Sequence, residues 1–187
     1  IYIGRFRGDG SGGIETTGIA FTGRHPSVMN SGSYELGMIV ESTGEVWAKS
    51  NTDVGTGIPK VQISTTDSSK KVFGVISNAE DENGTREHKF GNLVTWDKVE
   101  TNNRLVINSL GEGAIMVCNI NGNLENGDYI TTSAIEGLGM KQDDDLLHNY
   151  TVAKIVQDCN FDSGTTDVTY NGVTYKTKLV GCTYHCG

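Results

Sequence analysis

Residues 111–156 constrain the fold of this chain most, because they alternate short apolar runs with glycine turns and show no helical period. Within them, residues 128–133 (DYITTS) alternate apolar and polar side chains as a half-buried strand does, and residues 136–139 (EGLG) form a tight turn. Residues 150–156 (YTVAKIV) are predicted to form another strand. A helical turn is possible only at residues 143–148. The sequence therefore predicts an all-β fold, a compact β-barrel or sandwich-like domain of short strands with glycine and asparagine turns.

The strand–turn–strand pattern occurs twice in the chain. Residues 36–47 resemble residues 126–140, and the later strand at residues 71–77 (KVFGVIS) resembles residues 150–156. In each copy a glycine precedes an apolar strand and a Ser/Thr cluster ends it. One interpretation is a weak internal duplication; the other is that short β-hairpins resemble one another anyway. An Asn-Gly pair at residues 171–172, between two alternating runs, also predicts a tight hairpin.

Composition and charge exclude several classes of function. With 25 Gly and only 2 Pro among 187 residues, the turns depend on glycine and asparagine rather than proline. The formal net charge of -8 argues against a nucleic-acid partner, which needs clustered Lys and Arg. No apolar run approaches the roughly 20 residues that span a bilayer. We therefore expect neither nucleic-acid binding nor membrane insertion.

Two segments are expected. Residues 1–21 read as an N-terminal strand and glycine-rich linker that continues from an upstream stalk, and residues 22–187 read as an all-β C-terminal module. The chain opens at Ile1 in what reads as the middle of a strand, so we expect a fragment of a longer protein. Pro26 is expected to interrupt the strand pattern, because proline has no N–H for a ladder. Residues 28–34 are then expected to form a loop.

The positions of the four cysteines in the sequence do not determine whether or how they form disulfide bonds. Cys118, Cys159, Cys182 and Cys186 allow three disulfide pairings, and reduced, packed thiols are the favoured interpretation. Cys182, His185 and Cys186 together look like part of a metal site, but a structural zinc needs four ligands. We predict no metal site and no cofactor.

Several motifs carry a resemblance to a known family. They are residues 111–113 (GEG), 118–130 (CNINGNLENGDYI), 137–142 (GLGMKQ), 150–154 (YTVAK), 21–25 (FTGRH), 70–75 (KKVFGV) and 179–182 (LVGC). With these motifs the chain resembles the C-terminal module of giant-virus and phage fibre and tail-spike proteins. It is similar to the intramolecular-chaperone, self-cleaving domain of those proteins. The resemblance covers nearly the whole chain from about residue 21 onward.

The resemblance implies a homotrimeric module on a virion surface appendage. Such a module promotes assembly of a fibre or spike and presents a surface to the host, where the partner is a glycan or a protein. A compact trimerising end is physically reasonable, because repetitive β-fibres have a weakly specified register and slow long-range pairing. Some relatives also cut themselves, so the alternative function is a single-turnover autoproteolytic endopeptidase. We expect no enzymatic activity beyond that.

The resemblance places self-cleavage residues near the start of the module, but no motif there matches with certainty. Asp9 and Ser11 lie in a glycine-rich turn that could bend the backbone toward a hydroxyl nucleophile, while a plain linker explains the same residues. His25 is the other catalytic candidate, as a general base. A packed or capping histidine is its alternative. Its partners would be nearby hydroxyl and carboxyl groups: Ser27, Ser31, Ser33 and Glu35.

Aromatic residues suggest a third function, a carbohydrate-binding β-module. The side chains that could stack on sugar rings are Trp47, Trp96, Tyr170 and Tyr175. Cross-strand packing is the ordinary alternative for aromatic residues on hairpins. Separately, His148 follows the acidic residues 143–145 and could titrate near neutrality if these groups approach. A solvated acidic turn, or a subunit contact, would explain the same residues.

Overall fold

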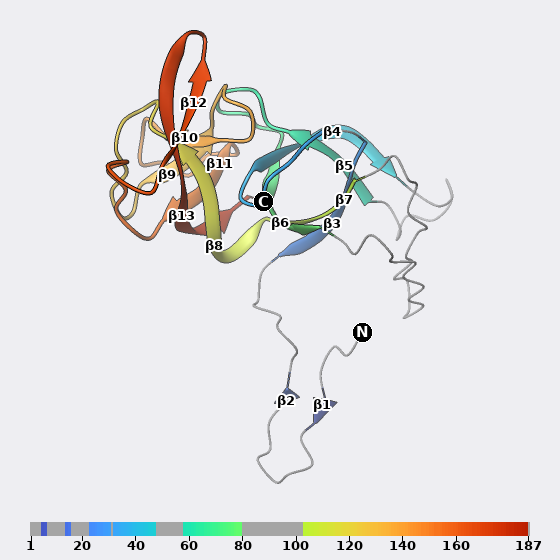
Figure 1. Cartoon of the computed structure of the whole chain (residues 1–187). Helices are drawn as coiled ribbons and strands as arrows, with labels where there is room; N and C mark the ends of the chain where they lie inside the picture. The colour runs from blue at the N-terminus through green and yellow to red at the C-terminus, as the bar shows by residue number, and fades with distance from the viewer. Residues whose placement is uncertain are drawn as a thin grey trace.

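The computed structural model describes residues 5–6, 14–15, 23–30, 32–47, 58–79 and 103–186, and every regular element in them is a β-strand. The all-β prediction is therefore confirmed (Figure 1). The strands are β1 Arg5–Phe6, β2 Ile14–Glu15, β3 Arg24–Met29, β4 Ile39–Trp47, β5 Ile58–Ile63, β6 Val72–Ala79, β7 Asn103–Asn108, β8 Leu110–Cys118, β9 Tyr129–Thr132, β10 Gly139–Lys141, β11 Thr151–Ile155, β12 Thr166–Tyr170 and β13 Val173–His185. The predicted boundary between residues 21 and 22 lies outside the described residues.

Strands β3 to β7 close into a small barrel in the order β3-β5-β4-β6-β7, which we call the first ring. Four of its five strand pairings are antiparallel. The fifth is parallel and consists of the single pair Val28↔Lys60 between β3 and β5. Apolar side chains that alternate along these strands fill the interior: Met29, Val40, Val61, Ile63, Ile76, Leu105 and Ile107.

Strands β8 to β13, without β12, repeat the same arrangement, which we call the second ring. Its order is β8-β10-β9-β11-β13, and the β11–β13 pairing closes it. Again four pairings are antiparallel, and the parallel one is a single pair, Gly139↔Val117 between β10 and β8. The similar segments noted in the sequence contain β4 and β9, and β6 and β11, which are equivalent strands of the two rings. The two rings thus share one strand order, as the internal-duplication interpretation predicts.

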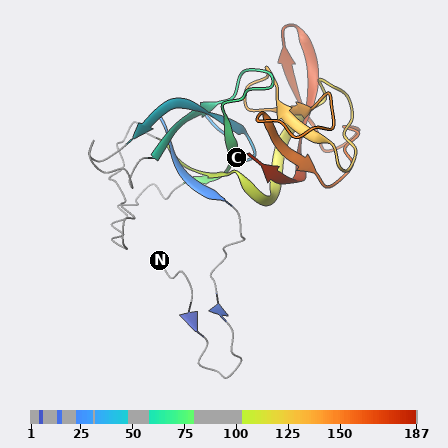
Figure 2. The same cartoon turned by 180° about the vertical axis from the view of Figure 1, so that it is seen from behind.

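The two rings lie side by side and share backbone hydrogen bonds (Figures 1 and 2). The N–H of Ile39 in β4 donates to the carbonyl of Gly137 at 2.8 Å, and the N–H of Met116 in β8 donates to the carbonyl of Gly37 at 2.9 Å. Ile39 is fully buried and belongs to the core of the second ring, although its strand is part of the first. The chain is therefore two fused rings with a common core rather than one barrel.

The expected break at Pro26 is wrong. Pro26 lies within β3, opposite Val106 of β7, and β3 runs on through residues 28 and 29. Proline is tolerated in a strand where its nitrogen does not face a ladder partner. The other neighbour of β3 is β5, and the two strands pair only at Val28, so the β5 side of β3 has no ladder partner at Pro26.

The predicted Asn-Gly hairpin is present. Asn171 and Gly172 have φ values of 51° and 78°, as a type I′ turn requires, and they join β12 to β13. This hairpin projects beyond the rest of the second ring (Figure 1). The helical turn considered at residues 143–148 is a non-helical loop, which forms the candidate site below.

Candidate functional site

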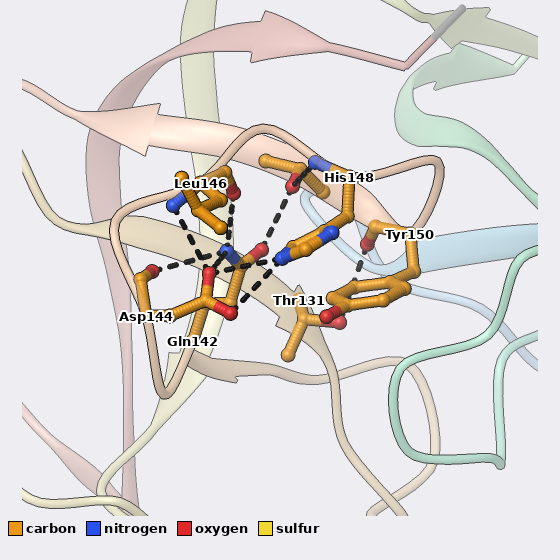
Figure 3. Close-up of polar contacts among 7 residues, drawn as sticks. Thr131, Gln142, Asp144, Leu146, His148 and Tyr150 are labelled. Carbon is orange, nitrogen blue, oxygen red and sulfur yellow. Dashed lines mark hydrogen bonds and ion pairs between the residues drawn. The ribbon is translucent and has the colours of Figure 1, made fainter.

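The densest group of polar side-chain contacts holds the loop between β10 and β11, residues 142–151, which we call the clasped loop (Figure 3). Gln142, directly after β10, is 5% exposed. Its Nε2 donates to the carbonyl of Leu146 at 2.7 Å and to Oδ1 of Asp144 at 2.9 Å. Its Oε1 accepts from the hydroxyl of Thr151 at 2.7 Å. The amide of Gln142 therefore fixes the loop from the inside.

An imidazole–carboxylate contact closes the clasped loop from the outside. Nε2 of His148 lies 3.0 Å from both carboxylate oxygens of Asp144. The ring of His148 stacks on Tyr150 with centroids 4.5 Å apart and an interplanar angle of 19°. The hydrogen bond with His148 lowers the pKa of Asp144 most, and the N–H of Leu146 lowers it further. The negative form of Asp144 is therefore the one that the loop stabilises.

The clasped loop displays two leucines to solvent. Leu146 and Leu147 are each 63% exposed, and they follow the exposed carboxylates of Asp143 and Asp145. Burying a leucine side chain contributes about 1.5–3 kcal/mol of favourable free energy, so a partner that covered Leu146 and Leu147 would gain this from each of them. Because the internal hydrogen bonds already order this backbone, a partner would lose little conformational entropy on binding it.

The imidazole of His148 is held in place by Asp144, but among the described residues no serine or cysteine side chain forms a hydrogen bond with it. In the described part of the chain, the imidazole of His148 has hydrogen-bond contacts with Asp144 alone. A second histidine, His185 on β13, lies 3.3 Å from the hydroxyl of Thr183 and edge-on to the ring of Tyr129. That pair occupies the outward-facing side of the sheet, and no carboxylate among the described residues has a hydrogen bond to His185. Neither geometry is a catalytic triad.

The catalytic candidate His25 lies on β3, is exposed, and packs at 5.7 Å against the ring of Phe73. Among the described residues, no hydrogen bond joins its imidazole to Ser27, Ser33 or Glu35. Ser27 is fully buried. His25 is thus an exposed residue of β3 whose ring lies against Phe73, and its role as a general base stays a prediction. Three further positions lie outside the described residues: Asp9, Ser11 and Ser31.

The aromatic candidates do not form one platform. Tyr170 and Tyr175 are half-buried and pack against a small buried cluster on the outer side of the second ring. The buried members of that cluster are Cys118, Ile135, Leu138 and Met140. Trp96 and the side chain of Trp47 lie outside the described residues. Tyr170 and Tyr175 pack against the same cluster, and stacking of a sugar on either ring stays a prediction.

All four cysteines are buried free thiols. Burial raises the pKa of Cys182 and of Cys186 to about 12. Strand alternation places these two thiols in the core of the second ring, while His185 between them faces outward, so the three cannot share one ion. In the described ranges, no group of three or more His, Cys, Asp or Glu side chains could hold a metal ion.

The chain was compared with known proteins. No model of a known protein family matches it, and no curated protein matches it either. No helix in the part of the chain that the structure describes has the length and apolar character needed to cross a bilayer.

Proposed function

We propose that the chain is a structural module of a virion fibre or spike, which promotes assembly into a homotrimer and presents a host-contact surface. The observation that carries the proposal is the clasped loop, which displays Leu146 and Leu147, each 63% exposed, on an ordered backbone. Two adjacent exposed leucines on a backbone held by internal hydrogen bonds suit a contact between copies, whereas single exposed apolar side chains such as Val46 are ordinary on a protein surface. The setting, a virion appendage, comes from the sequence resemblance.

The arrangement of the described residues suits assembly better than catalysis. Two fused rings with a shared core make a rigid end-piece, and a rigid end-piece can fix three chains in phase before a long β-fibre pairs. The two imidazoles with described polar contacts, His148 and His185, lack the nucleophile–base–acid geometry of a hydrolase. The leucine pair on the clasped loop then serves as part of the contact between copies.

Sedimentation equilibrium of the full chain tests the proposal. We expect a mass of three times 20.1 kDa. Replacing both leucines, Leu146→Ser with Leu147→Ser, should lower the mass toward that of one chain, because the contact loses its apolar side chains. The control is Val46→Ser, which removes a side chain 65% exposed on β4. A single-chain mass for the wild type would refute assembly, and a trimer that survives the double replacement would refute the role of the loop.

Self-cleavage is the alternative that the resemblance implies. It predicts that a longer chain including the upstream segment is cut once, and that Asp9→Asn or Ser11→Ala abolishes the cut. Intact-mass spectrometry separates this alternative from the assembly proposal. Carbohydrate binding is the second alternative, and a glycan array without signal would exclude it.

A further inference from the structure

The strand β12 has an open edge. It stands at the end of its sheet, and among the described residues β13 is its only partner. Its sequence, TDVTY, contains neither the lysine nor the proline with which proteins commonly protect an edge strand. Asp167 and Thr169 are exposed. An edge of this kind can accept another strand.

The turn determines which backbone groups face that edge. Tyr170 and Val173 flank the two-residue turn as a pair, and in such a hairpin the flanking pair exchanges both hydrogen bonds. Hydrogen-bonded and non-hydrogen-bonded pairs then alternate along the ladder. The N–H and C=O groups of Asp167 and Thr169 therefore point away from β13, to the open edge.

An independent contact supports this assignment. Lys176 of β13 is the cross-strand partner of Asp167. Its N–H donates to the side-chain oxygen of Asn119 at 2.8 Å, and its carbonyl accepts from the N–H of Asn119 at 3.1 Å. Because the backbone of Lys176 bonds on the side away from β12, this pair is a non-hydrogen-bonded one, as the alternation requires.

The open edge is complementary to itself in one register. If β12 meets a second β12 antiparallel, with Val168 opposite Val168, then Asp167 lies opposite Thr169 at both ends. The outward groups then form four backbone hydrogen bonds, and like faces of the two hairpins stay on the same side. The register centred on Asp167 would instead place two carboxylates opposite each other, which is destabilising.

We propose that β12 of one copy pairs with β12 of a second copy across a two-fold axis at Val168. The contact is isologous, since each copy offers the same five residues. It lies on the projecting hairpin, away from the body of the two rings (Figure 2). It goes beyond the proposed trimer: a two-fold contact joins chains of two different trimers, and the assembly closes at six chains when the three two-fold axes cross the three-fold axis.

The contact is small, so free chains associate weakly. An interface of two five-residue strands is well below the size of stable protein complexes, and we expect a dissociation constant on the order of 0.1 mM. When several copies are already held together, their effective concentration rises and the pairing strengthens. The pairing should therefore be detected as a change in molecular mass with protein concentration.

Sedimentation equilibrium of the full chain from about 10 μM to about 1 mM tests the pairing. We expect the mass to double over this range, from three chains to six. If the trimer proposal fails and the pairing holds, the mass doubles from one chain to two. If the trimer holds and the pairing fails, the mass stays at three. The two proposals therefore fail distinguishably.

A matched pair of proline variants identifies the edge. Thr169→Pro removes an outward N–H from the β12 edge and leaves the backbone hydrogen bonds of the hairpin intact, and should abolish the doubling. It also removes the contact between the hydroxyls of Thr169 and Thr174, which Thr174→Pro removes equally. Thr174→Pro makes the same change opposite it, on the other edge of the same hairpin, and should leave the doubling intact. If both variants fold and both show the doubling of mass, or both lack it, the proposal is overturned.

A measurement on the wild type covers the case in which a variant does not fold. At high concentration, amide exchange at Asp167 and Thr169 should slow severalfold relative to low concentration, because their N–H groups become bonded. The amide of Val168 bonds to β13 in either state and is the internal reference. Unchanged exchange at Asp167 and Thr169 would overturn the proposal.

Discussion

Replacing Ser69 by alanine tests how the buried carboxylate of Glu41 is stabilised. Glu41 lies on β4 and is 1% exposed. Its Oε2 accepts from the hydroxyl of Ser69 at 2.6 Å, and its Oε1 accepts from Gln62 Nε2 at 2.8 Å and from Lys71 Nζ at 3.2 Å. Ser69 is itself buried and bonds through its N–H to Thr132 of the second ring. Ser69→Ala removes the shortest of these three hydrogen bonds.

The expected cost follows from the charge of the acceptor. A hydrogen bond to a buried charged group contributes about 1.5–3 kcal/mol, and alanine leaves one carboxylate oxygen without its donor. For a domain of this size, each kcal/mol lowers the melting temperature by about 2–4 °C. Ser69→Ala should therefore lower the melting temperature by about 3–12 °C at pH 7. The matched control is Ser163→Ala at an exposed position, which should leave it unchanged.

The pH dependence gives a second readout. Burial raises the pKa of Glu41, but hydrogen bonds from Ser69, Gln62 and Lys71 outweigh it, so the pKa lies below 4.5. A carboxyl group whose folded-state pKa is lowered contributes stability above its unfolded-state pKa and loses it as the pH falls through the folded value. Without Ser69 the folded-state pKa of Glu41 rises toward its unfolded-state value, so the variant should lose less stability between pH 7 and pH 3 than the wild type does.

Melting curves from pH 7 down to about pH 3, a range that spans the ordinary glutamate pKa, check both expectations. A double-mutant cycle with Glu41→Leu isolates the pair: the double variant should lose less than the sum of the two single variants. If Ser69→Ala melts with the wild type and keeps the same acid profile, the hydroxyl does not stabilise the carboxylate and the reasoning is refuted.

Three further predictions concern single positions. Gly113→Ala should destabilise the fold by about 1–3 kcal/mol in urea denaturation, because a Cβ there would lie 2.7 Å from Cε2 of Tyr184. The thiols of Cys182 and Cys186 should not react with a thiol reagent at pH 8 until the protein unfolds, because burial raises their pKa to about 12; rapid labelling of the folded protein would contradict this. His148→Ala should speed amide exchange severalfold in the clasped loop, measured by mass spectrometry, since it removes the partner of the loop's aspartate.

Much of the fold could be predicted from local sequence, because alternation and turn chemistry are local properties. The Asn-Gly turn is correct because two consecutive positive φ values suit few other residues. The duplication was detectable through a glycine before an equivalent strand in each ring. Gly37 precedes β4 with φ 93°, and Gly127 precedes β9 with φ 104°. Both positions need a positive φ, which glycine adopts most readily, so both rings have a glycine there.

The site could not be predicted in the same way, because its residues gain their roles from distant partners. Glu41 lies in a strand as many exposed glutamates do, and its burial is tolerable because Gln62 on the next strand and Ser69 and Lys71 beyond it donate hydrogen bonds to its carboxylate. Gln142 was noted only as part of a motif, yet its amide organises the clasped loop. Pro26 was misjudged for a related reason: its effect depends on which side of β3 lacks a ladder partner.

The two rings pack against each other at a shared junction, where equivalent positions have different neighbours. The side chain of Ile39, from the first ring, packs in the core of the second, where its Cδ1 lies 3.3 Å from the position that a Cβ on Gly139 would occupy. Gly137 likewise lies directly against Met38. Residues at this junction face a different neighbour in each ring, so the side chains that fit there differ between equivalent positions, while strand order and turn glycines are the same in both rings. A shared topology with divergent interiors is therefore what a fused duplication should leave behind.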